Sequence, residues 1–241
     1  IRYIYMDKRD DDDDAFDAAH RGEVIVHTLI SCFHRFIFNL RAPLNFKRQI
    51  EKSSKTMSSS QEPRSPFRND ILKDRVVLIS GGATGIGFGC AVCFGLHGAK
   101  VAIMSRRRKK IEESVRRLKS KGIDAFGTTV DVRDYKRCVE SVNQVARHFG
   151  RIDFLINNAA GNFMTSSETL SPNGLATVLG IDLQGSFHMS KACLPHLKKT
   201  GSRSNGDAVI VNITATLQDH ATPFQFHAAY VVVVCVCVCV Q

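Results

Sequence analysis

The 241-residue sequence lacks a hydrophobic run long enough to cross a membrane. Its longest apolar segments, residues 24–33 and 231–240, span about ten residues each, whereas a membrane-spanning helix needs roughly 20. A cysteine framework is also missing, because three of the eight cysteines lie in residues 235–239 and the other five are scattered. Neither a disulfide scaffold nor a metal site is therefore predicted. With 44% hydrophobic and 23% charged residues, a wholly disordered chain is excluded.

Three segments of different character divide the chain. Residues 1–56 contain a five-aspartate run and no sustained periodicity, so we expect a leader that is disordered or not native to the fold. A targeting peptide is the weaker alternative, because transit peptides are poor in acidic residues. Residues 57–229 begin with a Ser/Pro-rich lead and carry the folded domain. Residues 230–241 alternate Val and Cys like a translated dinucleotide repeat; we expect this tail to lie outside the fold, with an edge strand as the alternative.

Short β-branched runs alternate with helical patterns through the central segment. Strands are predicted at residues 76–80, 100–104, 125–130, 152–156 and 208–213, and helices at 86–97, 109–121, 135–149 and 175–197. This alternation favours an α/β fold, a doubly wound parallel sheet with helices on both faces. Such sheets bind ligands at the carboxyl ends of their strands.

A glycine-rich loop follows the first predicted strand and opens the first helix. A tight turn there needs Gly81, close approach of the backbone to a pyrophosphate needs Gly85, and packing of the helix favours Gly87. The helix N-terminus adds unpaired N–H groups that bind phosphate. We therefore predict a nucleotide-binding loop formed by Gly81, Gly82, Ala83, Thr84, Gly85 and Ile86; a turn without a ligand is the plain alternative.

The end of the second predicted strand lacks the acidic residue that NAD-selective folds use to bind the ribose hydroxyls. Arg106 stands there, followed by further basic residues as far as Lys110, and arginine pairs well with a 2′-phosphate. We expect NADP(H), with Arg106 and Lys110 as cofactor ligands; a solvated helix face is the alternative for residues 107–110. Residues 106–121 hold nine basic and two acidic side chains, most of the net charge of +10. The charge therefore indicates a phosphorylated cofactor and substrate, not a nucleic acid.

Several motifs together resemble the short-chain dehydrogenase/reductase superfamily. They are the loop at 80–87, Asp131-Val132, residues 157–161 and residues 211–213. Residues 159–163, 170–174, 181–182 and 212–217 more narrowly resemble the peroxisomal 2,4-dienoyl-CoA reductases. The resemblance covers about residues 67–229 and implies a Rossmann-type sheet that is truncated after about the fifth strand. It also implies NADPH-dependent reduction of 2,4-dienoyl-CoA to 3-enoyl-CoA. Another short-chain enoyl or ketoacyl reductase, or a truncated nucleotide-binding product without activity, are the alternatives.

The resemblance also implies roles for individual residues. Asp131 would bind the adenine and Asn157 the ribose region of the cofactor. The acyl-CoA would contact Arg106, Arg133, Phe163, Ser171, Pro172 and Asn173. The plainer alternatives are core packing for Phe163, a turn at Asn173 and a helix cap at Asp131.

The catalytic tyrosine and lysine of most superfamily members are missing. Counted from Ala215, which takes the place of the usual serine, their positions hold Ala228 and Val232, and Tyr230 is out of register. In the reductases that this sequence resembles, an aspartate takes over the proton transfer through a water; here it is Asp182, which then needs a pKa near neutrality. A helix-start cap is the alternative for Asp182.

Because the family lysine is absent, we expect that the 241-residue chain does not turn over substrate. The resemblance implies a peroxisomal location and homo-oligomeric full-length relatives. The chain itself ends in Val240-Gln241, not in a peroxisomal address.

Overall fold

The computed structural model describes residues 2–4, 65, 67–161, 169–203 and 208–213. The residues outside these ranges include Phe163, Ala215, Ala228, Val232 and the whole Val-Cys tail, so the predictions made for them are not tested.

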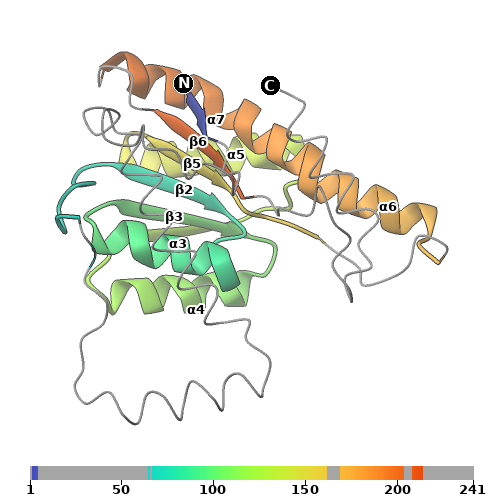
Figure 1. The fold of residues 1–241 in the computed structure, drawn as a ribbon, viewed down its shortest axis with the longest axis horizontal. Coiled ribbons are helices and arrows are strands. Elements are labelled where there is room, and N and C mark those ends of the chain that lie inside the picture. Colours follow the sequence, from blue (N-terminus) through green and yellow to red (C-terminus); the bar gives the residue numbers. More distant parts are fainter. Residues whose placement is uncertain (1, 5–64, 66, 162–168, 204–207, 214–241) are drawn as a thin grey trace, which may run out of the picture.

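One parallel sheet forms the centre of the described structure, with the strand order β1-β6-β5-β2-β3-β4 (Figure 1). Its strands are β1 (Arg2–Ile4), β2 (Val76–Ser80), β3 (Lys100–Ser105), β4 (Ala125–Thr129), β5 (Phe154–Asn157) and β6 (Val209–Asn212). The chain builds outward from β2 through β3 to β4, and then continues on the other side of β2 with β5 and β6. This reversal between β2 and β5 is the point at which open α/β sheets bind ligands. The predicted doubly wound parallel sheet is confirmed.

The short strand β1 pairs with β6, with Arg2 opposite Val209. It belongs to the segment expected to be foreign to the fold, and residues 5–56, which follow it, lie outside the described residues. The division of the chain at residues 56 and 229 therefore stays a prediction.

The helices lie on both faces of the sheet, with α3 and α4 on one side and α5 and α7 on the other (Figure 1). They are α3 (Gly85–Leu96), α4 (Arg108–Lys119), α5 (Tyr135–Phe149), α6 (Pro172–Val178) and α7 (Gly185–Arg203), with the π-helix η3 (Leu179–Gln184) between α6 and α7. Local signals fix several of their ends. Asp134 caps α5 by accepting a hydrogen bond from the Arg137 N–H at 3.1 Å, and Gly150 ends the helix with a left-handed φ of +80°. Ser171 caps α6 directly before Pro172 in its first turn.

The predicted helix over residues 175–197 is the main difference between sequence and structure. The structure divides this region into α6, η3 and α7, with a π-helical stretch in the middle. Gly180 lies within this stretch, and Gly185 directly follows it. Gly185 packs closely against the segment after β4, since a Cβ at this position would lie 2.5 Å from Val132 Cγ2. Helical periodicity does not distinguish a π-helix from an α-helix, and π-helical turns often occur at functional sites.

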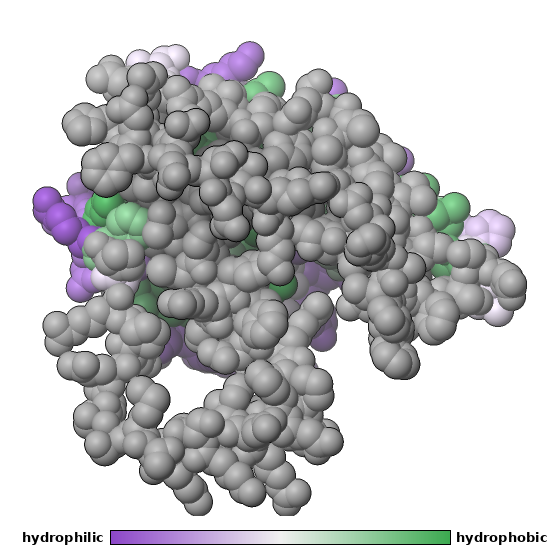
Figure 2. Space-filling model, in the orientation of Figure 1, coloured by the Kyte–Doolittle hydropathy of each residue, from purple (hydrophilic) through white to green (hydrophobic). Residues whose placement is uncertain are grey.

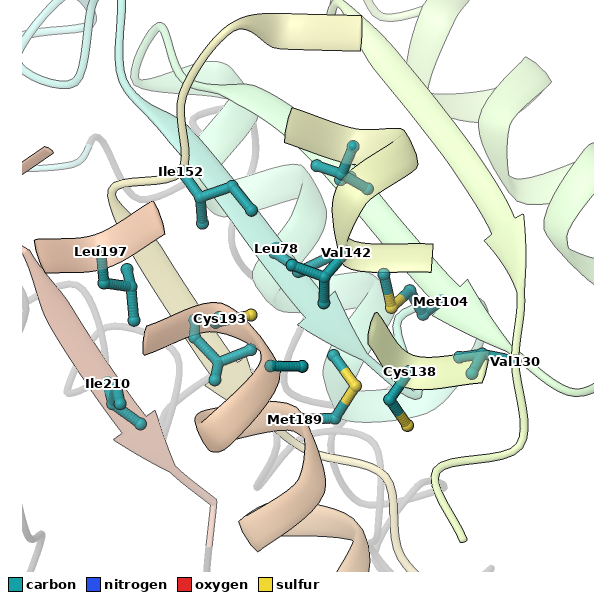
Figure 3. Close-up of a cluster of buried hydrophobic side chains, with 14 of the residues drawn as sticks. Leu78, Met104, Val130, Cys138, Val142, Ile152, Met189, Cys193, Leu197 and Ile210 are labelled. Carbon is teal, nitrogen blue, oxygen red and sulfur yellow. The ribbon is translucent and has the colours of Figure 1, made fainter. Parts of the chain in front are cut away.

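Two hydrophobic clusters hold the layers together. Along β2, Val77 and Ile79 face α3 and α4, whereas Leu78 faces α5 and α7. Figure 3 shows the second cluster, in which Leu78 and Met104 of the sheet meet side chains of α5 and α7. Figure 2 shows described hydrophobic side chains next to hydrophilic ones near the left and right edges of the view.

The buried thiols of this second cluster behave as apolar groups. Burial raises the pKa of Cys138 to about 12, so its thiol stays protonated. The four cysteines within the described ranges are all free thiols.

The buried carboxylate of Asp153, which was not predicted from the sequence, connects the amino ends of three neighbouring strands. Asp153 is fully buried, accepts the Val76 N–H at 2.8 Å and pairs with Arg75 at 3.0 Å and with Arg151. Its backbone bonds Val76 and Val209 of the neighbouring strands. This cluster lies at the end of the sheet opposite to the glycine loop, which leaves the carboxyl ends for function.

Candidate functional site

The glycine loop after β2 has the geometry that a phosphate-binding turn requires. Gly81 and Gly85 have left-handed φ angles of +66° and +56°. A Cβ at Gly81 would lie 2.9 Å from Ala159 Cα, and one at Gly87 would lie 2.5 Å from the Gly81 carbonyl oxygen. At Gly85, by contrast, a Cβ would meet nothing within 4 Å. Gly81 and Gly87 therefore allow close packing, while Gly85 faces open space at the N-terminus of α3.

The other residues of the predicted loop divide by exposure. Gly82 and Ala83 are buried, and a Cβ at Gly82 would lie 2.8 Å from Ile103 Cγ2, so these two shape the loop from inside. Thr84 is exposed and Ile86 half-buried beside Gly85. These exposed positions, together with the N–H groups of the first turn of α3, are the groups that a phosphate would meet.

Three polar side chains that were not predicted as site residues hold this loop in place. The Ser80 hydroxyl accepts the backbone N–H groups of Asn158 and Ala159, both at 3.1 Å. The Asn158 amide donates to the carbonyl oxygens of Ser80 and Gly81, both at 3.2 Å, and the Ser114 hydroxyl donates to Ala83 O at 2.7 Å. The loops after β2 and β5 thus form one unit. The sequence signal for the role of Asn158 is its position directly after the apolar run that forms β5 (Phe154–Asn157).

The basic end of the site lies where β3 and β4 end. Arg106 is exposed after β3 and forms no ion pair with any described residue. Asp131 after β4 pairs with Arg133, whose Nε lies 3.0 Å from Oδ1 and whose Nη2 lies 2.6 Å from Oδ2. The hydrogen bonds from Arg133, with a smaller contribution from the charge of Arg106, hold the pKa of Asp131 below its usual range. Asp131 was expected to bind the adenine and Arg133 the acyl-CoA, but in the structure the two residues form an ion pair with each other.

One of the alternatives is decided here. Asp131 does not cap α5, because Asp134 does, so the cap interpretation of Asp131 is wrong. Lys110 lies on α4 and pairs with Glu113 at 3.0 Å, with both side chains about half exposed. Its place in the structure is that of a residue on a solvated helix face, and its contact with a cofactor stays a prediction.

An open depression of about 750 Å³ adjoins this basic end, at the start of α5. It is lined by Asp131, Arg133, Asp134, Tyr135, Lys136 and Arg137. The stem of Arg133 also faces Gly180 of η3, where a Cβ would lie 3.5 Å from Arg133 Cδ. The depression and the helix that carries Asp182 are therefore adjacent.

Asp182 is the only carboxyl group that the structure places in η3, and it is only 7% exposed. Its Oδ1 accepts the Gly161 N–H at 2.6 Å. Burial raises the pKa of Asp182 to about 6, and the hydrogen bond from Gly161 opposes that rise. Asp182 lies in the middle of a continuous helical segment and bonds another loop, so the helix-cap alternative is wrong.

The remaining predicted residues lie around this centre in different surroundings. Asn157 is 3% exposed, and its amide donates to Ser190 Oγ at 3.0 Å and to Asn212 Oδ1 at 2.9 Å. It joins the ends of β5 and β6 to α7, and its contact with a cofactor ribose stays a prediction. Ser171, Pro172 and Asn173 are exposed at the start of α6, which projects beyond the carboxyl ends of the strands (Figure 1). In the described ranges no group of His, Cys, Asp or Glu side chains is arranged to hold a metal ion, and no helix is long and apolar enough to span a membrane.

A doubly wound parallel sheet with a glycine loop at its switch point is typical of a nucleotide-binding α/β protein. Residues 75–231 match the short chain dehydrogenase family, and the chain belongs to that family.

Named relatives agree with this assignment. The chain is 46% identical over 171 residues to a peroxisomal 2,4-dienoyl-CoA reductase of Arabidopsis thaliana, which covers 68% of this chain and 56% of the relative. It is 39% identical over 163 residues to the peroxisomal 2,4-dienoyl-CoA reductase of Rattus norvegicus, covering 67% of this chain and 54% of the relative. The chain thus spans about half the length of these relatives.

Solved structures show the same fold. A short chain dehydrogenase from Bacillus anthracis superposes with a TM-score of 0.60 at 34% identity, covering 68% of this chain and 66% of that one. A 3-ketoacyl-(acyl-carrier-protein) reductase from Brucella melitensis, solved in complex with NADH, superposes with a TM-score of 0.64 at 26% identity, covering 70% and 67%.

Proposed function

We propose that the protein represented by this sequence is an NADPH-dependent oxidoreductase that reduces 2,4-dienoyl-CoA to 3-enoyl-CoA. The single observation that carries the proposal is Asp182, a buried carboxyl group with a pKa raised to about 6 that accepts a hydrogen bond from Gly161 in the loop after β5. The relatives from Arabidopsis thaliana and Rattus norvegicus, which are named as peroxisomal 2,4-dienoyl-CoA reductases, support this choice of substrate and a peroxisomal location.

The residues present fit a dinucleotide with a 2′-phosphate. Gly85 leaves open space where a pyrophosphate would lie against the first turn of α3, and Arg106 stands at the end of β3 where a 2′-phosphate would need a cation. Asp131 and Asn157 complete the proposed cofactor set. The cofactor, when bound, supplies the hydride for the reduction.

Asp182 would supply the proton that completes the reaction. Reduction of the conjugated diene adds a hydride at its far end and a proton next to the thioester, so that two double bonds become one. A carboxyl group with a pKa near 6 is partly protonated close to neutral pH, and can therefore give up a proton to a bridging water and regain it from solvent. An ordinary exposed aspartate would be almost fully ionised there.

The acyl-CoA would lie along the surface between η3 and the start of α5. Arg133 lines the open depression, and its stem faces Gly180 of η3, the π-helix that carries Asp182. With Ser171, Pro172 and Asn173 at the start of α6, it forms the described part of the proposed substrate set; Phe163 lies outside the described residues.

Ligand binding tests this proposal without depending on turnover, which we expect to be absent because positions 228 and 232 hold Ala and Val. The protein is titrated with NADPH by fluorescence, and 2,4-dienoyl-CoA or 3-ketoacyl-CoA is then added to the complex in a calorimeter. Tighter binding of the dienoyl-CoA supports the proposal, and preference for the ketoacyl-CoA supports another reductase. NADPH binding without affinity for either thioester would identify a nucleotide-binding product and contradict the substrate assignment.

A further inference from the structure

The open depression at the start of α5 contains two ion pairs and a lysine outside them. Arg133 pairs with Asp131, and the Arg137 Nε lies 3.6 Å from Asp134 Oδ2. Lys136 lines the same depression, is exposed, and forms no ion pair with any described residue. Three cations therefore meet two carboxylates in the depression, and the charge of Lys136 is the one that its described acids leave unbalanced.

An aromatic ring lies next to this lysine. Tyr135 directly precedes Lys136, lines the depression and is 37% exposed. The Nζ atom of Lys191 on α7 lies 5.5 Å from the centroid of the Tyr135 ring and 5.6 Å from that of Phe187, which is also exposed. Aromatic faces stack on nucleic-acid bases, and lysine ammonium groups pair with phosphate oxygens. The depression therefore has the side chains that a phosphorylated nucleoside needs.

The backbone at the start of α5 does not supply this binding. Asp134 caps the helix by accepting the Arg137 N–H at 3.1 Å, so a carboxylate already occupies the first turn. This negative charge repels a phosphate from the backbone N–H groups. Recognition of an anion in the depression therefore depends on its side chains.

We propose that Tyr135 and Lys136 bind the phosphorylated adenosine of the acyl-CoA: the Tyr135 ring stacks on the adenine, and the Lys136 ammonium group pairs with the 3′-phosphate. This inference rests on the proposed function, because it places the coenzyme end of that substrate. Arg133 connects the depression with η3, since it lines the depression and its stem faces Gly180. An acyl-CoA with its thioester at η3 would place its nucleotide on this side of Arg133.

The cofactor also carries a phosphorylated adenosine, for which other residues are proposed. Arg106 at the end of β3 would meet its 2′-phosphate, and Asp131 would meet its adenine. Asp131 also lines the depression, so the two adenosines would be neighbours. A second phosphate group needs a second cation, and Lys136 provides it. Separate affinities for the two ligands distinguish the two adenosines.

Two forms of the coenzyme test the proposal on the wild-type chain. The chain is titrated in a calorimeter, with NADPH present, with coenzyme A and with 3′-dephospho-coenzyme A. Loss of the 3′-phosphate should weaken binding about fivefold, as expected for a solvent-exposed ion pair. Equal affinities, or no binding of either coenzyme, would overturn the proposal. Neither ligand carries an acyl chain, so this result does not depend on a preference for dienoyl groups.

Replacement of Lys136 by alanine then tests which residue meets the phosphate. Lys136→Ala should lower the affinity for coenzyme A about fivefold and leave that for 3′-dephospho-coenzyme A within about a factor of two, because the second ligand lacks the contact. Lys198→Ala is the matched control, since it removes an exposed lysine of α7 that does not line the depression. Equal losses for the two coenzymes in Lys136→Ala, or the same loss in the control, would contradict the assignment.

Tyr135 is tested through its ring. Tyr135→Ala should weaken the binding of both coenzymes about tenfold, as expected when stacking on a base is lost, whereas Tyr135→Phe keeps the ring and should bind like the wild type. Both variants should retain the wild-type affinity for NADPH. A loss of NADPH affinity in place of coenzyme affinity would assign the depression to the cofactor and overturn the proposal.

The proposed function is tested by a different comparison, that between dienoyl-CoA and ketoacyl-CoA. A chain that discriminates coenzyme A from its dephosphorylated form but prefers the ketoacyl thioester would keep the adenosine site and lose the proposed function. A chain that prefers the dienoyl thioester but binds both coenzymes equally would keep the function and lose the site. The two failures are therefore distinguishable.

Discussion

The proposed function predicts a preference for NADPH over NADH, which replacing Arg106 by alanine should remove. Arg106 is exposed after β3 and has no ion-pair partner among the described residues, so its guanidinium group is available to a 2′-phosphate. A hydrogen bond to a charged group contributes about 1.5–3 kcal/mol, and solvent exposure places this one at the lower end. Since about 1.4 kcal/mol corresponds to a factor of ten, the affinity for NADPH should fall about tenfold.

Quenching of protein fluorescence, or enhancement of the cofactor emission, measures both dissociation constants directly. The affinity for NADH, which carries no 2′-phosphate, should stay within about a factor of two in Arg106→Ala, because surface substitutions away from a contact change binding by only a few tenths of a kcal/mol. Arg116→Ala on α4 is the control, since it removes the same charge from an exposed position of the same basic segment. Equal losses for NADPH and NADH, or an equal loss of NADPH affinity in the control, would refute the reasoning.

Three further predictions concern pH and stability. Because the folded-state pKa of Asp182 is raised from 3.8 to about 6, the folded protein binds this proton more tightly than the unfolded chain, and stability is lost as pH rises from about 4 to 6. Asp182→Asn should therefore be more stable than the wild type at neutral pH by up to about 2 kcal/mol, and not at pH 4; urea unfolding at both pH values measures this, and equal differences would contradict it. Asp153→Ala should lower the free energy of unfolding by about 3 kcal/mol, because it removes the buried carboxylate that accepts the Val76 N–H and pairs with Arg75 and Arg151, whereas Asp70→Ala in an exposed pair should leave the free energy of unfolding nearly unchanged. Gly85→Ala and Gly81→Ala should both lower the melting temperature because both glycines have a left-handed φ, but Gly81→Ala should lower it more, since its Cβ would also lie 2.9 Å from Ala159 Cα; Gly85→Ala should weaken NADPH binding in addition, and a larger loss of melting temperature in Gly85→Ala would refute this order.

The architecture was predictable because its signals are local. The run at Val76–Ser80 is continuously apolar and entirely buried, as expected for a central parallel strand, and its prediction is confirmed. The start and end of α5 were predicted at the observed residues, Tyr135 and Phe149, although the residue that caps the helix is Asp134 and not Asp131. Strand order then brings the motifs at the strand ends to one edge of the sheet without any further information.

The finer geometry of the site was not predictable, because it depends on contacts between distant segments. The π-helix that carries Asp182 is followed by Gly185, which packs closely against Val132, and the periodicity of the sequence shows neither the π-helix nor this contact. The bond from Gly161 to Asp182 crosses 21 positions of sequence. The role of Asp153 likewise cannot be predicted from the sequence, because it depends on the contact of its side chain with Val76 of β2.

The pairing of Asp131 with Arg133 was missed for a different reason. The two residues are only two positions apart, but the resemblance assigned them to different ligands, and this hid their mutual attraction. A bound adenine would meet Asp131 as part of an ion pair. Opposite charges two positions apart therefore indicate this ion pair as directly as the family motifs indicate ligand contacts.

Calorimetric titration of the NADPH complex with 2,4-dienoyl-CoA tests the central claim most directly. The proposed function predicts saturable binding at one site per chain, stronger than that of 3-ketoacyl-CoA and weakened by Arg133→Ala, which removes a cation from the depression beside η3. Equal or stronger binding of the ketoacyl-CoA, or no binding of either thioester by a chain that binds NADPH, would contradict it.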